Sequence, residues 1–140
     1  TGSTPLYFAV NENYLDIVEL LLKNNADINL KFEKGTSLLH CAAENENEKM
    51  IELLLKYNLD INVRDGFGNN ALWSYGYTGN LEIMELLLKN GADAYTKNKV
   101  GEILVGKKKQ PMGVSHSPYS IALEDDDQEQ LALFEKYKNG

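Results

Sequence analysis

Apolar residues of this chain gather in short clusters whose spacing is that of a helix face. Between Leu81 and Leu88 the apolar positions are 81, 83, 84, 86, 87 and 88, and steps of three and four residues place them on one side of an α-helix. A shorter apolar segment precedes this one, and a polar break separates the two. The same order of a short and a long segment recurs along the chain, and it predicts a series of helical hairpins.

The leucine cluster of the long segment returns at a constant interval. Residues 20–23, 53–56 and 86–89 all read Leu-Leu-Leu-Lys, so each step is 33 residues. Other residues keep the same step, among them Gly2, Gly35 and Gly68, and Asp27, Asp60 and Asp93. A fixed period of this length indicates a repeat architecture in which each unit is one supersecondary element.

The period and a short signature together resemble those of the ankyrin-repeat family. That family has 33-residue units with the signature Thr-Pro-Leu-His-x-Ala, and residues 4–9, Thr-Pro-Leu-Tyr-Phe-Ala, match it in part. Residues 37–42 read Ser-Leu-Leu-His-Cys-Ala, whereas at 70–75 only Leu72 is kept. A fourth copy fits if about 14 residues are inserted after Gly101, which aligns residues 117–122 with the signature.

The resemblance implies an all-α ankyrin-repeat solenoid of about four stacked helix-turn-helix repeats with projecting hairpin tips. We expect a single domain over residues 1–140, with repeats near 2–34, 35–67, 68–100 and 101–140 and an insertion at about 103–116. The chain enters the first repeat almost at its signature and has no initiating methionine. We therefore also expect that an N-terminal part is missing.

Several residues predict local structure. Thr4-Pro5 and Ser117-Pro118 are suited to start helices, because the hydroxyl accepts from a free amide and proline needs no donor in the first turn. Asn90-Gly91 offers a left-handed residue that ends a helix. Tyr75 replaces an alanine, and we expect Gly76 to give room for it. Glu48 stands where other copies have leucine, so we expect it at the outer surface.

Composition narrows the classes of function. With 43% hydrophobic residues and a net charge of −7, the chain has the composition of a soluble globular protein that repels nucleic acid and anionic membranes. The single cysteine, Cys41, excludes an internal disulfide and a cysteine-rich zinc site. No signal peptide or membrane-spanning run is present. We expect a cytoplasmic protein that is monomeric alone, or a secreted effector if a longer parent chain carries an export signal.

Candidate catalytic and metal-binding groups do not assemble into a known site. His40 and Cys41 are neighbours whose side chains diverge on a helix, and His116 is a single loop histidine. The carboxylates of residues 124–129 lack the spacing of a calcium loop, and Gly106-Lys107-Lys108-Lys109 lacks that of a phosphate loop. We expect no enzyme, no cofactor and no metal.

The resemblance implies that another protein binds at the hairpin tips and at the concave face of the first helices. The residues that the repeat does not fix are the candidates for this contact: Lys31, Glu33, Lys34, Thr36, Glu44, Asn45, Phe67, Asn69, Trp73, Tyr77, Thr78, Lys99 and Val100. Trp73 has two interpretations, since it either fills the turn between repeats or lies partly exposed to a partner. Lys107, Lys108 and Lys109 form either a basic contact for an acidic partner or an insertion without a role.

Three kinds of function are consistent with this pattern. The first is a non-catalytic protein-interaction module. The second is the target-recruiting segment of a larger enzyme or bacterial effector, and the third is an inhibitor or immunity-type protein. The sequence favours the first.

Overall fold

The computed structural model describes residues 3–78, 80–98, 104–105, 108–109 and 117–138. The helices of this part are α1 (Pro5–Asn11), α2 (Leu15–Lys23), α3 (Leu38–Glu44), α4 (Glu48–Lys56), α5 (Ala71–Thr78), α6 (Leu81–Lys89), α7 (Pro118–Glu124) and α8 (Gln128–Tyr137). One 3-10 turn, η1, covers Glu33–Gly35, and two antiparallel strands of two residues each, β1 (Leu104–Val105) and β2 (Lys108–Lys109), lie in the insertion. The prediction of an all-α solenoid is confirmed.

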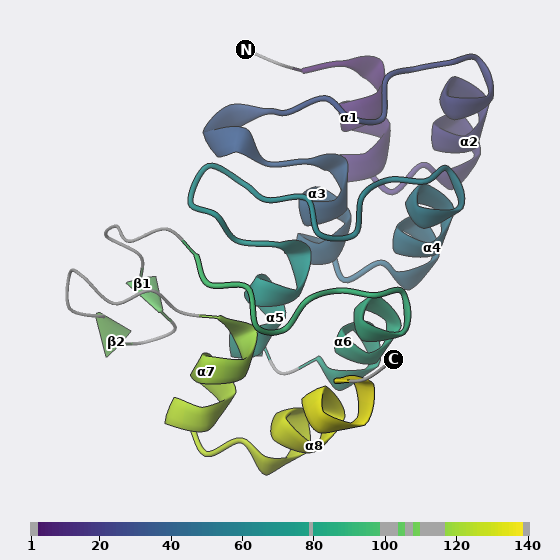
Figure 1. Cartoon of the computed structure of the whole chain (residues 1–140). Coiled ribbons are helices and arrows are strands. Elements are labelled where there is room, and N and C mark those ends of the chain that lie inside the picture. The colour runs from purple at the N-terminus through teal and green to yellow at the C-terminus, as the bar shows by residue number, and fades with distance from the viewer. Residues whose placement is uncertain (1–2, 79, 99–103, 106–107, 110–116, 139–140) are drawn as a thin grey trace.

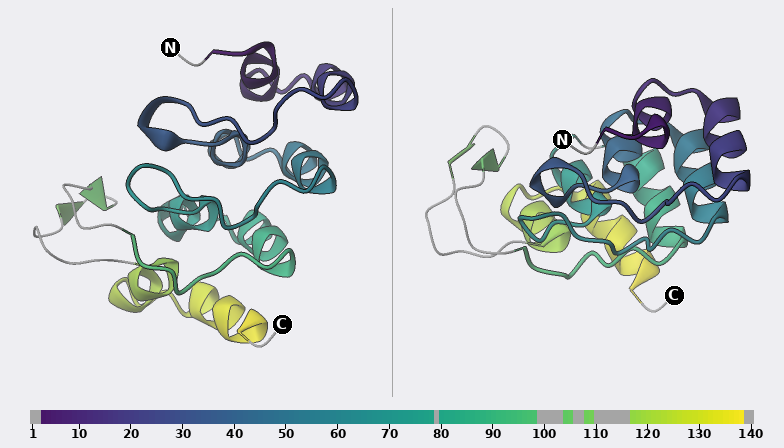
Figure 2. Two further views of the ribbon diagram at one scale, coloured as in Figure 1. Left: turned by 45° about the horizontal axis from the view of Figure 1, so that its top comes forward. Right: turned by 90° about the horizontal axis from the view of Figure 1, so that it is seen from above.

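The helices pair into four hairpins that stack in one direction (Figure 1). α1, α3, α5 and α7 form one layer, in which each helix contacts the next, and the second helices form a parallel layer. The first helices begin 33, 33 and 47 residues apart, so the insertion leaves the stacking order unchanged. Seen from above, the long loops after α2 and α4 project on the side of the first helices (Figure 2). These loops are the predicted hairpin tips.

Polar caps start the helices where the sequence predicts them. Thr4 Oγ1 accepts from the amide of Tyr7, and Ser117 Oγ accepts from the amide of Ser120, while a proline follows each cap. The helices α4, α6 and α8 begin with a different cap, which lies at one equivalent position of the repeat. In each, the side chain of the cap residue accepts from the amide three residues further along the chain, and the cap residues are Asn47, Asn80 and Asp127.

Left-handed residues end the second helices at a constant repeat position. Gly91 has φ 87°, which confirms the predicted helix end, and Asn25 and Asn58 adopt the same region with φ 63° and 60°. Asparagine tolerates this conformation better than most residues, because its short amide makes local hydrogen bonds. The chain can therefore turn sharply after each hairpin.

The core lies between successive hairpins and is continuous along the stack. Val18, Ile51 and Met84 occupy one repeat position and are fully buried. Tyr75 is buried in the place of an alanine, and its hydroxyl donates to the carbonyl of Ala43. The surroundings of Gly76 lie outside the described residues, so its expected compensating role stays a prediction. Glu48 is exposed, as predicted.

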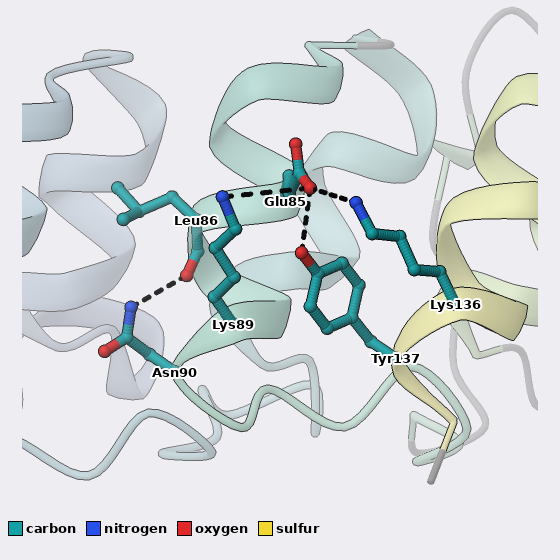
Figure 3. Close-up of polar contacts among 6 residues, drawn as sticks. All are labelled: Glu85, Leu86, Lys89, Asn90, Lys136 and Tyr137. Atoms are coloured by element: carbon teal, nitrogen blue, oxygen red, sulfur yellow. Dashed lines mark hydrogen bonds and ion pairs between the residues drawn. The ribbon is translucent and has the colours of Figure 1, made fainter. Parts of the chain in front are cut away.

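A polar cluster at Glu85 fastens the last helix to the stack (Figure 3). The Nζ of Lys136 lies 2.7 Å and the hydroxyl of Tyr137 2.8 Å from Glu85 Oε1, and both groups come from α8. Lys89, one turn along α6, is 3.8 Å away. The hydrogen bonds from Lys136 and Tyr137 lower the pKa of the Glu85 carboxyl to about 2. The two hydrogen bonds that favour the ionised carboxylate most come from α8, so they require α8 to be docked.

Replacement of Glu85 by glutamine should weaken the acid dependence of stability. The pKa of Glu85 is lower in the folded state than its ordinary value of 4.5. The carboxylate therefore contributes its full stability above pH 4.5, and this contribution is lost as the pH falls towards about 2. We expect the free energy of unfolding, measured by urea titration, to fall less steeply in Glu85→Gln across this window. Glu82→Gln, which removes an exposed carboxylate from the same helix, is the matched control. Equal slopes in all three proteins would contradict this role of Glu85.

Candidate partner-binding surface

Successive hairpin tips are joined by backbone and side-chain hydrogen bonds. The amide of Gly66 donates to the carbonyl of Lys34 over 2.6 Å, which links the second tip to the first. The Nζ of Lys31 donates to the carbonyl of Arg64, and the guanidinium of Arg64 donates to the carbonyl of Lys97. Each of these side chains reaches a carbonyl 33 residues further along the chain. The tips therefore form one edge with a fixed spacing.

Two glycines allow the first two tips to touch. A Cβ atom on Gly66 would lie 2.6 Å from the carbonyl oxygen of Lys34, and one on Gly35 would lie 2.7 Å from the amide nitrogen of Gly66. Both neighbours are backbone atoms, which cannot rotate away as a side chain can. Gly35 also has φ 71°, in the region that favours glycine. Only glycine at both positions permits this approach.

An aspartate turn holds Phe67 at the second tip. The Oδ1 of Asp65 accepts from the amides of Phe67 and Asn69, each over 2.9 Å, so one carboxylate closes the turn around the aromatic residue. Arg64 Nε donates to the carbonyl of Gly68 over 2.7 Å. The Phe67 side chain is 42% exposed. The turn thus presents a large apolar group to solvent from a backbone that side-chain hydrogen bonds hold in place.

The tip contact should be sensitive to a single methyl group. We expect Gly66→Ala to cost about 1–3 kcal/mol in the free energy of unfolding, since the new Cβ overlaps a backbone oxygen. Gly91→Ala is the matched control, because Gly91 has a left-handed backbone and no atom within 4 Å of an added Cβ. It reports the cost of a left-handed alanine alone, about 1–2 kcal/mol.

Chemical denaturation gives both stabilities, and amide chemical shifts of residues 31–36 report the position of the tip. These shifts should change in Gly66→Ala and stay constant in Gly91→Ala. Unchanged shifts in Gly66→Ala would show that the contact between the two tips does not set their spacing.

A comparison with models of known protein families shows which family the chain belongs to. A family model described as ankyrin repeats in three copies matches residues 6–98. The chain belongs to the ankyrin-repeat family. Proteins of this family are generally protein–protein interaction modules and are typically non-catalytic. A search of curated proteins finds no match. The fourth hairpin, α7–α8, lies beyond the matched residues and continues the ankyrin stack.

Most of the candidate residues that the structure describes lie at the surface of the ankyrin stack. Those that are exposed are Lys31, Glu33, Lys34, Glu44, Asn45 and Phe67. Thr36 is half-buried, and its hydroxyl donates to the carbonyl of Glu33. Lys31 and Asn45 also bond between repeats, since Asn45 Nδ2 donates to the carbonyl of Asn11. These two residues serve the stack as well as its surface.

Two candidates, Asn69 and Trp73, are buried. Asn69 is buried because its carbonyl accepts from the ring of His40 and its amide donates to Asp65. Trp73 is buried in α5, at the repeat position of His40, which agrees with the interpretation that it fills the turn between repeats. Neither side chain offers the surface that a partner contact needs.

The remaining candidates lie wholly or partly outside the described residues. Lys99, Val100 and Lys107 fall there, as does His116, while the side chains of Tyr77 and Thr78 fall outside although their backbone belongs to α5. Lys108 and Lys109 form β2, which was not expected, and only their backbone pairing with β1 is described. A role of these residues in binding stays a prediction.

His40 has a structural role that joins a helix start to the next tip. Its Nδ1 accepts from the amide of Ser37, and its Nε2 lies 2.9 Å from the carbonyl of Asn69. A carbonyl only accepts, so Nε2 carries the proton. Burial lowers the pKa of His40, and a proton on Nδ1 would also oppose the Ser37 amide. The neutral ring is therefore the form that the fold requires.

Neither Cys41 nor any cluster of metal ligands suggests catalysis in the described residues. Burial raises the pKa of the Cys41 thiol to about 11, whereas a nucleophilic cysteine needs a lowered pKa. Within residues that the structure describes, no three His, Cys, Asp or Glu side chains gather as metal ligands do. Among the described helices, none has the length and apolar composition needed to cross a bilayer.

Acidification should destabilise the protein through His40. The pKa of His40 in the folded state lies below its ordinary value of 6.5. The neutral ring therefore contributes its full stability above pH 6.5, and part of this contribution is lost as the pH falls towards the folded-state pKa. His40→Gln should lower the free energy of unfolding by about 1–3 kcal/mol near neutral pH and remove this acid slope. His116→Gln, a change at the other of the two histidines, is the matched control. Urea unfolding at several pH values measures the slope, and a slope that persists in His40→Gln would refute the assignment.

Proposed function

We propose that this chain binds another protein through the edge formed by its first two hairpin tips, with Phe67 as the central anchor. The observation that carries the proposal is an aromatic side chain, 42% exposed, on a turn fixed by the carboxylate of Asp65. Aromatic residues are enriched at the energetic centres of protein interfaces. An anchor on an ordered turn loses little conformational freedom when a partner binds.

Two charged residues lie on the tip beside this anchor, where they would form part of the polar rim of an interface. Glu33 and Lys34 are exposed on the neighbouring tip, and the contact between Gly66 and the Lys34 carbonyl keeps that tip beside Phe67. Rim charges of both signs guide the choice and orientation of a partner more than they add affinity. We expect a folded protein or peptide with an apolar pocket for Phe67 and, where it meets the first tip, groups that complement the charges of Glu33 and Lys34.

The test compares two exposed aromatic residues on different parts of the molecule. Phe67→Ala should weaken binding to a partner identified by affinity capture at least about tenfold, the loss of an interface anchor. Tyr95→Ala is the matched control, since Tyr95 is an exposed aromatic residue on the segment after α6, outside the first two tips. Titration calorimetry gives the affinities, and circular dichroism should show the same helicity for both variants. Wild-type affinity in Phe67→Ala would refute the proposed surface.

A further inference from the structure

The first hairpin exposes apolar side chains at the N-terminal end of the stack. Phe8 on α1 is 59% exposed, and Ile17 and Leu20 on α2 are 47% and 61% exposed. Tyr14, between the two helices, is also exposed, and its ring centroid lies 6.5 Å from that of Phe8. We call these four residues the N-terminal face. Among the helices that the structure describes, none lies beyond α1 and α2 on this side (Figure 1).

At the positions of Phe8, Ile17 and Leu20, the equivalent residues of later repeats are more buried, because another hairpin precedes them. Cys41, 33 residues after Phe8, is 7% exposed. Met50 and Ile83, at the position of Ile17, are 0% and 2% exposed. Leu53 and Leu86, at the position of Leu20, are half-buried. The residue type stays largely apolar along the series while the exposure changes, so a preceding hairpin is what covers these positions in the later repeats.

The opposite end of the stack has a different character. Glu135 of α8 occupies the position that Leu22 and Leu88 fill in earlier repeats, and it is exposed and paired with Lys138 over 3.4 Å. A terminal repeat needs a polar outer face, because nothing shields it from water. α8 satisfies this requirement in part, whereas α2 does not. If two copies stacked head to tail, the charged pair Glu135–Lys138 of one copy would face the apolar residues Ile17 and Leu20 of the other. This arrangement disfavours a second copy as the cover of the N-terminal face.

We propose that the N-terminal face is an interface between repeats, and that its occupant is one more ankyrin-type helical hairpin encoded upstream in the same polypeptide. The face continues the series of contacts from α1 to α3 and from α2 to α4, so the occupant has the geometry of those hairpins. It presents aliphatic side chains at the positions of Val10, Val18 and Leu22, which are buried in the first hairpin. This inference does not depend on the partner surface at the tips.

The first test uses the complete polypeptide that contains these residues. Its reading frame should hold at least about 33 residues before residue 1, the length of one repeat. Hydrogen exchange should then be at least about tenfold slower for the amides of α1 and α2 in the complete polypeptide than in residues 1–140, and similar for α7 and α8. A reading frame without that length, or equal exchange in α1 and α2, would overturn the inference.

The second test is a matched pair of substitutions in both backgrounds. Ile17→Asn should lower the Tm by several degrees in the complete polypeptide and much less in residues 1–140, because only the former buries the side chain. Leu123→Asn is the control, since Leu123 is an exposed leucine at the other end of the stack. Its effect should be small and alike in the two backgrounds. If Ile17→Asn also lowered the Tm by the same amount in the two backgrounds, the inference would be overturned.

A third measurement separates the upstream hairpin from a second copy of the chain. Sedimentation equilibrium of the complete polypeptide should give a monomer in both the wild type and Ile17→Asn. A dimer that Ile17→Asn dissociates would show that the N-terminal face is covered by another copy, and would overturn the assignment to an upstream hairpin.

Discussion

The burial of apolar surface between neighbouring hairpins is the constraint on which the rest of the structure depends. A single hairpin has an apolar flank on each side and cannot cover either by itself, so its stability is shared with its neighbours. Val18, Ile51 and Met84 are fully buried at equivalent points of the stack. Stacking at a constant step also fixes the loops, because Lys31 and Arg64 each reach the carbonyl one repeat further on.

The stack and the surface that it presents are linked through a few polar side chains. His40 belongs to a helix start in the second repeat, yet its Nε2 holds the carbonyl of Asn69 at the base of the next tip. Asp65 then closes the turn around Phe67. The exposed aromatic residue is thus positioned by contacts that begin in the core. Separation of a buried scaffold from exposed tips allows surface residues to vary without a loss of stability.

The sequence predicted the features that repeat and missed those that depend on distances between repeats. Caps such as Thr4 and the left-handed Gly91 follow from local chemistry, and the structure confirms them. The burial of Asn69 and the contact of Gly66 with Lys34 arise only when two tips lie side by side. The exposure of Ile17 escaped prediction for a related reason. A periodic pattern predicts the same burial for every copy, and it carries no information about which copy lacks a neighbour.

The third repeat shows how the stack tolerates the loss of its signature histidine. The bridge made by His40 needs an acceptor towards the helix start and a donor towards the next loop, and an indole ring has a donor only. Trp73 therefore cannot replace both bonds. Asn70 makes two other bonds at this helix start, since its Oδ1 accepts from the amide of Trp73 and its Nδ2 donates to the carbonyl of Asp93 over 2.7 Å. One amide side chain thus caps α5 and joins it to the segment that follows α6, so the third repeat keeps a polar link between a helix start and a loop without the histidine.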